Sequence, residues 1–255
     1  MRWIDLEGAV NARDTGGMGT NDGGTTVTGR LLRSDNLQEL SPADVTRLVR
    51  DIGLTTVVDL RSTAELVAEG PAPLHAVDGI RHVHLPVLPE QGSATDVVAY
   101  ALLNRDDLDR SRYPEDPMCG HYLGYLEDRP DEVVGAVRTI ASSDGAVLVH
   151  CAAGKDRTGV VVALALSAVG VRQEAIVADY AASGERTEAL TERLRRSPTY
   201  ADDINSQPPR PPRPGTMTAF LAQVRSRYGG TRRWLAGHGF GERDLDQLRA
   251  KLLRP

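Results

Sequence analysis

Short apolar runs and longer segments of helical periodicity alternate along the chain. Four of the short runs predict buried strands, at residues 31–33, 55–60, 83–86 and 146–149. The longer segments between them predict helices.

Ser41 and Pro42 begin the first predicted helix, which extends to residue 50, because serine caps a helix and proline suits its first position. Residues 130–141 repeat valine and isoleucine on one helical face, and they predict a second helix. A third, almost wholly apolar, starts near Arg157 and continues to Gly170. The alternation predicts a single α/β fold, with a central parallel or mixed sheet flanked by helices on both faces.

The loop between the last predicted strand and the third helix reads His-Cys-Ala-Ala-Gly-Lys-Asp-Arg-Thr-Gly, residues 150–159. It places Cys151 and Arg157 together at a helix N-terminus, where unpaired backbone N–H groups and a partial positive charge attract an anion. Such surroundings lower the pKa of a thiol from about 8.5 to between about 3.5 and 7.5. Cys151 is therefore a candidate nucleophile toward a phosphate monoester.

The other residues of the loop suit the same chemistry. Arg157 can hold two phosphate oxygens with its planar guanidinium, and the loop amides can bind the charge that spreads over the transferred group. Thr158 can donate its hydroxyl to the sulfur of Cys151, and Gly154 permits a tight turn. The expected phosphate-binding residues are Ala152, Ala153, Gly154, Lys155, Asp156 and Arg157. The alternative is a buried structural cysteine beside a surface arginine.

The motif resembles that of the cysteine-dependent protein tyrosine phosphatase superfamily, and within it the bacterial tyrosine/serine and phosphoinositide phosphatases of the mycobacterial protein tyrosine phosphatase B type. Further segments fit this family, at residues 11–17, 32–37, 58–62, 177–180 and 228–252. The resemblance implies a tyrosine phosphatase-like fold and a phosphocysteine intermediate, with no cofactor. It implies phosphotyrosine as substrate, with phosphoserine, phosphothreonine and phosphoinositides as further candidates.

Two residues of the loop bear on substrate and mechanism. Lys155 adds a second cation, as in phosphatases similar to lipid phosphatases, or else it faces solvent. In similar enzymes the aspartate at the position of Asp156 is a proposed general acid, although it could instead orient Arg157 or cap the helix. In most tyrosine phosphatases the general acid is an aspartate on a separate loop. In this chain no Asp follows the corresponding strand end directly, and Glu90 and Asp96 are the alternatives that this segment offers.

Two irregular segments interrupt the alternation of strands and helices, residues 89–117 and 197–216. The first, and the longer segment 187–228 that contains the second, are candidate lid or insert segments. The second contains a proline-rich stretch, residues 208–214, between predicted helices at 187–196 and 216–228. Similar enzymes carry a lid here, so the resemblance implies a lid that gates the site. A docking site for proline-binding domains is the alternative.

Other polar residues have two interpretations each. Five of them either border the phosphate, as the resemblance suggests, or form structural ion pairs: Arg13, Asp14, Arg33, Asp59 and Arg61. His82 and His84 share one side of a strand, but no third ligand stands at metal spacing, so no metal is expected. His150 is expected to tune Cys151 through hydrogen bonds rather than to act as a base.

The composition limits which other kinds of protein the chain can be. A chain of 255 residues, 40% of them hydrophobic, fits one phosphatase domain over residues 1–255. The net charge of −5 gives no electrostatic reason to expect nucleic-acid binding. No apolar stretch reaches membrane-spanning length. Two cysteines form no disulfide framework, so a cytoplasmic location is expected, with non-Sec export left open. Cys119 is either a packed thiol or a protective partner of Cys151.

Two other classes compete with a phosphatase. One is a phosphate-binding module that has lost turnover, and the other is a sulfurtransferase with a loop cysteine. The presence of both Cys151 and Arg157 favours catalysis, and the Lys-Asp-Arg-Thr-Gly sequence favours phosphate.

Overall fold

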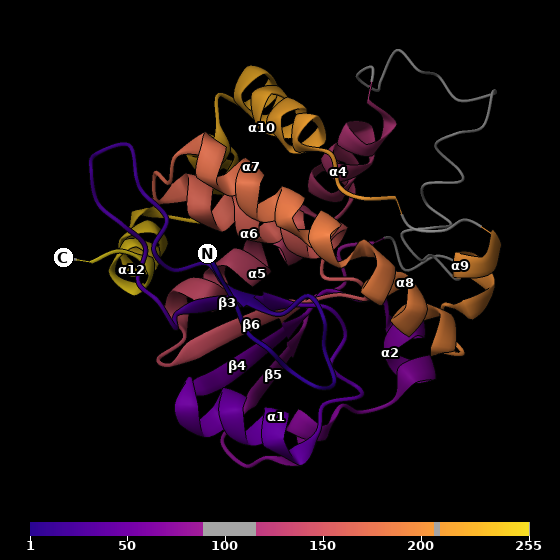
Figure 1. Cartoon of the computed structure of the whole chain (residues 1–255). Coiled ribbons are helices and arrows are strands. Elements are labelled where there is room, and N and C mark those ends of the chain that lie inside the picture. Colours follow the sequence, from indigo (N-terminus) through magenta and orange to yellow (C-terminus); the bar gives the residue numbers. More distant parts are fainter. Residues whose placement is uncertain (89–115, 207–209, 255) are drawn as a thin grey trace.

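The computed structural model describes residues 1–88, 116–206 and 210–254, which form an α/β architecture (Figure 1). Its described strands make one six-stranded mixed sheet in the order β1-β2-β3-β6-β4-β5. β1 and β2 extend β3 in antiparallel pairs, whereas β3, β6, β4 and β5 run parallel. The strands are β1 Arg2–Trp3, β2 Arg13–Asp14, β3 Leu31–Ser34, β4 Leu54–Asp59, β5 Arg81–His84 and β6 Ala146–His150.

The four parallel strands end at the same edge of the sheet. Ser34 of β3 and Asp59 of β4 both lie in register with His150, the last residue of β6. Asp59 also lies in register with His84, the last residue of β5. The loop that begins with Cys151 therefore starts at the middle of this edge, which is where open α/β sheets bind their ligands.

Helices cover both faces of the sheet (Figure 1). One face carries α4 Pro117–Asp128, α5 Pro130–Ser142, α6 Asp156–Ala168, α7 Gln173–Ala182 and α10 Pro214–Tyr228. The other carries α1 Pro42–Thr46, its π-helical continuation Arg47–Asp51 and the 3-10 turn Pro73–Ala76. Near the edge where the parallel strands end lie α2 Thr63–Glu69, the 3-10 turn Ser183–Arg186, α8 Thr187–Arg196 and α9 Ala201–Ser206. The C-terminal part contains α11 Thr231–Gly237 and α12 Glu242–Leu252, and α12 packs against α5.

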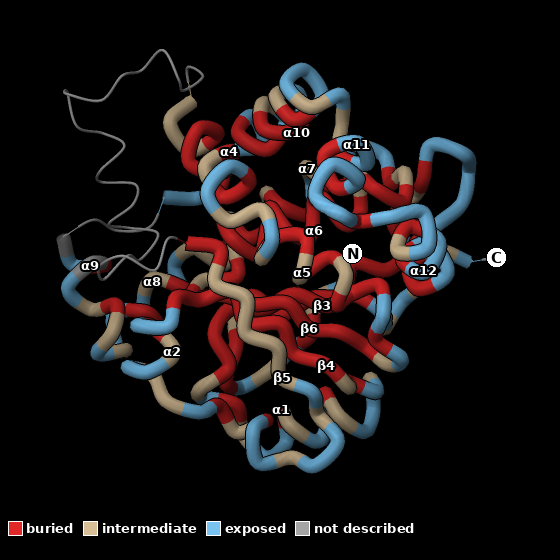
Figure 2. The backbone as a smooth tube through the Cα atoms, turned by 180° about the vertical axis from the view of Figure 1, so that it is seen from behind, coloured by how far each residue is buried: buried red, intermediate tan, exposed pale blue. Residues whose placement is uncertain are grey.

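Side chains of the central strands alternate between two hydrophobic cores, as the two-residue period of a strand requires. Val58, Val147 and Val149 join the core beneath α4 to α7. Val57 and Leu148 join the core beneath α1. The buried backbone of the central strands is visible between the two helical layers in Figure 2. This double burial explains why β6 appears in the sequence as a nearly continuous apolar run, and why β4 is rich in β-branched residues.

The predicted fold class is confirmed, and most predicted elements agree with the structure to within two residues. Ser41 caps α1 in a capping box with Asp44, and Pro42 occupies the first turn. The strand predicted at 83–86 is misplaced, because β5 spans Arg81–His84. β5 is an edge strand whose residues are exposed or half-buried, so Arg81 belongs to it although the apolar pattern excludes it.

Candidate active site

The loop from β6 to α6 turns sharply at Gly154. This residue has φ +63°, a left-handed conformation that favours glycine. A side chain here would also collide with the chain beneath, since a Cβ on Gly154 would lie 2.2 Å from the carbonyl oxygen of Ser34. The end of β3 therefore supports the loop directly, and α6 begins immediately after it at Asp156.

Donors from the N-terminal part of the chain bind four successive carbonyl groups of the loop. Asn36 donates its backbone N–H to Ala152 (3.0 Å), and Asn11 donates its side-chain amide to Ala153 (2.8 Å). Arg33 donates to the carbonyl oxygens of Gly154 (2.7 Å) and Lys155 (3.3 Å). In a planar trans peptide the N–H points opposite to the C=O. The amides of residues 153–156 therefore point away from these donors, as a cradle for an anion requires.

Arg157 lies in the first turn of α6, fully buried and paired with a carboxylate from α2. Its two terminal nitrogens bind Glu65 at 2.6 Å and 2.9 Å. The same carboxylate accepts the backbone N–H of Ser62 at 2.7 Å and the hydroxyl of Tyr200 at 3.0 Å. Glu65 thus fixes the guanidinium plane of Arg157 and connects it to the segment between α8 and α9.

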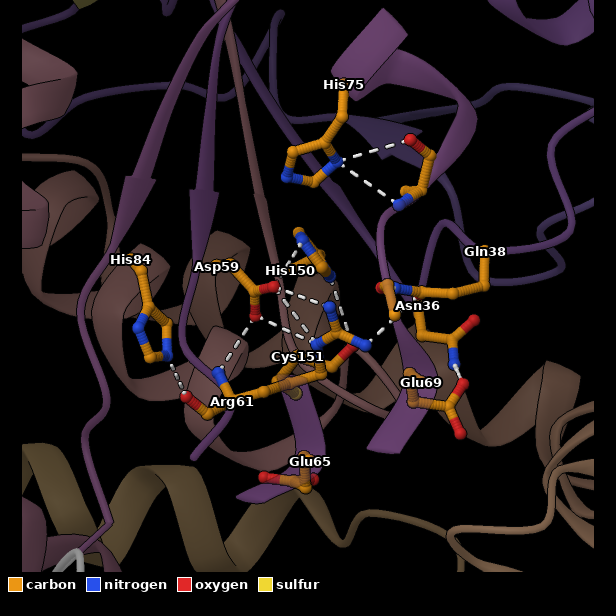
Figure 3. Close-up of polar contacts among 12 residues, drawn as sticks. Asn36, Gln38, Asp59, Arg61, Glu65, Glu69, His75, His84, His150 and Cys151 are labelled. Atoms are coloured by element: carbon orange, nitrogen blue, oxygen red, sulfur yellow. Dashed lines mark hydrogen bonds and ion pairs between the residues drawn. The ribbon is translucent and has the colours of Figure 1, made fainter. Parts of the chain in front are cut away.

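Cys151 is fully buried at the start of the loop, beside a polar cluster at the ends of β6 and β4 (Figure 3). His150 contacts the Cys151 carbonyl oxygen at 3.3 Å and Asp59 Oδ2 at 3.5 Å, and Arg61 binds the same Oδ2 at 2.6 Å. Burial lowers the pKa of His150 to about 4, so its imidazole is neutral at pH 7. Burial opposes ionisation of Asp59, but His150 and Arg61 outweigh it and hold the pKa of Asp59 well below its usual range.

Asp156 is buried beneath two tyrosines and beside Lys155. Tyr122 of α4 donates its hydroxyl to Asp156 Oδ1, and the hydroxyl of Tyr180 of α7 lies 2.7 Å from that of Tyr122. Lys155 Nζ lies 3.3 Å from Asp156 Oδ2 and donates to the carbonyl oxygen of Arg210 at 3.0 Å. The carboxylate therefore has a different partner on each oxygen.

Arg13 and Arg33 share a fourth buried carboxylate, Asp179 of α7. Arg13 Nε binds Asp179 Oδ1 at 2.9 Å and Arg33 Nη1 binds Oδ2 at 2.6 Å. Arg33 binds the loop and Arg13 shares its carboxylate, so both belong to a structural network that supports the loop from outside. Asp59 pairs with Arg61 at the strand ends and contacts His150. Asp14 accepts the backbone N–H groups of residues 16 and 29 and stabilises a turn.

The sequence of the chain matches the model of the tyrosine phosphatase family over residues 4–254. The chain belongs to this family. It is 34% identical over 207 residues to the triple specificity protein phosphatase PtpB of Mycobacterium tuberculosis, an alignment that covers 74% of this chain and 72% of the relative. It is 30% identical over 226 residues to a tyrosine-protein phosphatase of Nostoc commune, covering 83% and 75% of the two chains. The protein is thus a protein phosphatase of the tyrosine phosphatase family.

α8 and α9 of the phosphatase cover the loop. Leu194, Tyr200 and Ile204 pack against Ala152, and Ala153 borders the same cluster. Polar contacts hold this cover in place, because Arg193 binds Asp35 and Asn36 and Ser197 Oγ donates to Glu69 at 2.5 Å. Cys151 and Arg157 have no exposed surface beneath it.

The structure differs from the sequence expectation at Thr158. Its Oγ1 is buried and makes no hydrogen bond with any residue that the structure describes. The expected donation to the sulfur of Cys151 is therefore absent from this conformation. Thr158 lies in α6, one residue beyond Arg157.

The remaining candidates have other surroundings. His82 Nε2 bonds to the Leu74 carbonyl oxygen at 3.2 Å, while His84 Nε2 bonds to that of Arg61 at 2.8 Å, so the two imidazoles do not converge. No cluster of three metal-ligating side chains occurs in the described part of the chain. Glu90 and Asp96 lie outside the described residues.

Both cysteines are free thiols, and burial raises the pKa of Cys119 to about 12. None of the helices in the described ranges has the length and apolar character to cross a membrane.

Sequence reasoning gave no role to three residues of the site, Glu65, Tyr122 and Tyr180, although Tyr180 falls within the family-like segment 177–180. The pattern Ser62-x-x-Glu65 does signal a helix N-terminus, and the capping box is present. The pattern gives no sign that the same carboxylate binds Arg157. The sequence around the two tyrosines gives no sign of their role. Asp156 lies 34 residues from Tyr122, and only the packing of α4 on α6 brings the two together.

Proposed function

We propose that this phosphatase hydrolyses phosphate monoesters in two steps through a phosphocysteine on Cys151. In the first step the thiolate attacks phosphorus, the P–S bond forms, and the P–O bond to the leaving group breaks. The leaving oxygen takes a proton from Asp156. In the second step water attacks phosphorus and gives a proton to Asp156, and inorganic phosphate leaves as the thiolate is restored.

The observation that carries this proposal is the construction of the loop around Cys151. Four carbonyl groups are bound from outside, so the amides of residues 153–156 face the opposite way. Arg157 is held by two contacts with Glu65, which orients a planar cation for two phosphate oxygens. Preorganised donors of this kind stabilise charge on a transferred phosphoryl group without reorganising during the reaction.

Asp156 supports the role of general acid by its place in the loop next to Arg157. A general acid must reach the leaving oxygen, and a carboxyl group that belongs to the phosphate loop itself is suitably placed to do so. The ionised Asp59, on the other side of His150, is unsuited to donate a proton. Asp156 therefore serves the proposal better than the other carboxylate near Cys151.

We propose that α8 and α9 form a lid over one phosphatase domain. The lid predicted at residues 187–228 is too long, because α10 packs against α4 and α7 and contributes Met217 and Phe220 to the core. α8, α9 and the segment between them pack against Ala152 and Ala153 of the loop, and Cys151 and Arg157 have no exposed surface, so we expect substrate to enter after this cover moves. Lys155 contributes to the closed form, since its ammonium binds the carbonyl oxygen of Arg210. A lid would exclude water from the phosphocysteine until the second step.

Substrates of this site are phosphotyrosine and, by the same chemistry, phosphoserine, phosphothreonine and phosphoinositides. Lys155 supports the wider range, because it offers a second cation beside the phosphate loop once the lid moves. The similarity to the mycobacterial triple specificity phosphatase supports it too. Two free thiols support a reducing compartment such as the cytoplasm.

The test is turnover of p-nitrophenyl phosphate by the full chain in the presence of a chelator. We expect metal-independent release of nitrophenol, and no product from Cys151→Ser. Wild-type protein that binds phosphate but releases no product would instead be a binding module. Rates on a phosphotyrosine peptide, a phosphoserine peptide and phosphatidylinositol monophosphate vesicles then define the substrate range.

A further inference from the structure

Tyr122 and Tyr180 are two buried phenols that the two-step mechanism does not use. Tyr122 has no exposed surface and Tyr180 has 2%. Their hydroxyl groups lie 2.7 Å apart, and that of Tyr122 also reaches Asp156 Oδ1. The ring of Tyr122 is fixed by edge contacts with Tyr180 and Phe220, at centroid distances of 6.1 Å and 6.0 Å.

The direction of these hydrogen bonds follows from the protons available. Burial, reinforced by the nearby Asp156 carboxylate, raises the pKa of both phenols, so both stay protonated at neutral pH. Tyr122 has one proton and donates it to Asp156. Tyr180 must therefore donate to Tyr122, and the chain of donors runs from Tyr180 through Tyr122 to Oδ1.

We propose that Tyr122 is a positioning residue for Asp156 and that Tyr180 holds Tyr122 in that role. Because Oδ1 accepts the tyrosine proton, the proton that the acid delivers is carried on Oδ2, beside Lys155 Nζ. When Oδ2–H protonates the leaving oxygen, the carboxylate that remains is stabilised by the hydrogen bond from Tyr122. This inference rests on the proposed role of Asp156.

Other charges near these groups set the background of the titration. They are Lys155 and Arg157 in the loop and first turn of α6, Arg33 of β3, Asp179 of α7 and Asp116 at the start of α4. The hydrogen bond to Asp156 Oδ1 comes from the Tyr122 hydroxyl and not from any of these charged groups. A hydrogen bond to the ionised form lowers the pKa of a carboxyl group. Removing the phenol hydroxyl therefore removes a hydrogen bond that stabilises the carboxylate left after proton transfer.

The test is the pH dependence of kcat/KM for three variants. The basic limb of this profile reports the acid in the free enzyme. In Tyr122→Phe we expect this limb to move upward by about 1 pH unit, the usual strength of a hydrogen bond to a charged group. In Tyr180→Phe the limb should move the same way by less. Tyr125→Phe is the matched control, since this neighbour on α4 bonds to His121 at 2.8 Å.

Leaving-group dependence is the second readout. Tyr122→Phe should lower kcat/KM more for phenyl phosphate than for p-nitrophenyl phosphate, because the poorer leaving group depends more on the acid. A purely structural tyrosine would lower the melting temperature without moving the limb or separating the two substrates. If Tyr122→Phe fails to fold, Tyr180→Phe decides the question by the same two readouts.

Asp156→Asn separates the two possible failures. If it keeps the basic limb and slows both substrates equally, the proposed acid is wrong and this inference falls with it. If it abolishes the limb while both tyrosine variants leave the wild-type limb in place, the acid stands and the positioning role of Tyr122 is refuted.

Discussion

Substitution of Glu65 is the perturbation that follows most directly from the site. Glu65→Gln keeps the shape of the side chain but removes its charge and one acceptor. The wild-type carboxylate has four close donors, two from Arg157 and one each from Ser62 and Tyr200. The amide can satisfy fewer of them, so the guanidinium of Arg157 loses its fixed plane.

The expected loss of activity is that caused by misplacing a hydrogen-bond donor that stabilises the transition state. Removal of one such donor costs on the order of 10²–10³ in rate, or about 2.7–4 kcal/mol. We expect Glu65→Gln to lower kcat/KM for p-nitrophenyl phosphate to this extent. Glu65→Ala should in addition destabilise the fold by about 3–5 kcal/mol, because Arg157 stays buried without its counter-charge.

Glu69→Gln is the matched control, since it lies one turn further along α2. Glu69 binds Ser197 and Asn36 rather than Arg157, so Glu69→Gln weakens a lid contact but leaves the carboxylate that orients the guanidinium in place. Steady-state kinetics and urea denaturation of the three variants separate activity from stability. A folded Glu65→Gln variant with kcat/KM within about threefold of wild type would refute the reasoning, because the orientation of Arg157 would then not limit catalysis.

Two further predictions concern the lid and pH. Tyr200→Phe removes the hydroxyl that binds Glu65 at 3.0 Å, so the lid should open more often and alkylation of Cys151 by iodoacetamide should accelerate about 2–10-fold. An unchanged alkylation rate would show that this contact does not hold the lid. The pKa of His150 is lowered to about 4 in the folded state, so the unfolded chain binds the extra proton between about pH 6.5 and 4. Stability from this group is complete above pH 6.5 and is lost as pH falls, by at most about 3 kcal/mol. Urea midpoints from pH 7.5 to 4.5 should show a smaller loss in His150→Asn than in wild type.

The sequence predicts the catalytic loop well because its features are local. A strand, a ten-residue motif and an apolar helix follow one another directly in the sequence, and the structure has β6 and α6 at the predicted positions. The capping serine of α1 and the helix over residues 130–142 are local in the same sense. Two-residue strands such as β1 and β2 are too short for any periodicity to reveal them.

The partners of the loop depend on tertiary packing and could not be predicted. Glu65 lies 92 residues from Arg157, and Asn11 lies 142 residues from Ala153. Arg33 and Asp59 illustrate the same limit, since their types fit both a phosphate contact and an ion pair. Only the fold shows that Arg33 pairs with Asp179 and Asp59 with Arg61.

The ionisation of Cys151 is the claim on which the proposed mechanism depends, and the pH dependence of its alkylation measures it. The rate of modification by iodoacetamide should follow one titration with an apparent pKa below 7. Lid closure scales the absolute rate but does not set the midpoint. Cys119 contributes little, because its pKa is raised to about 12, and Cys151→Ser measures that background. A midpoint near 8.5 or above would contradict the account, since the loop would then hold an ordinary thiol.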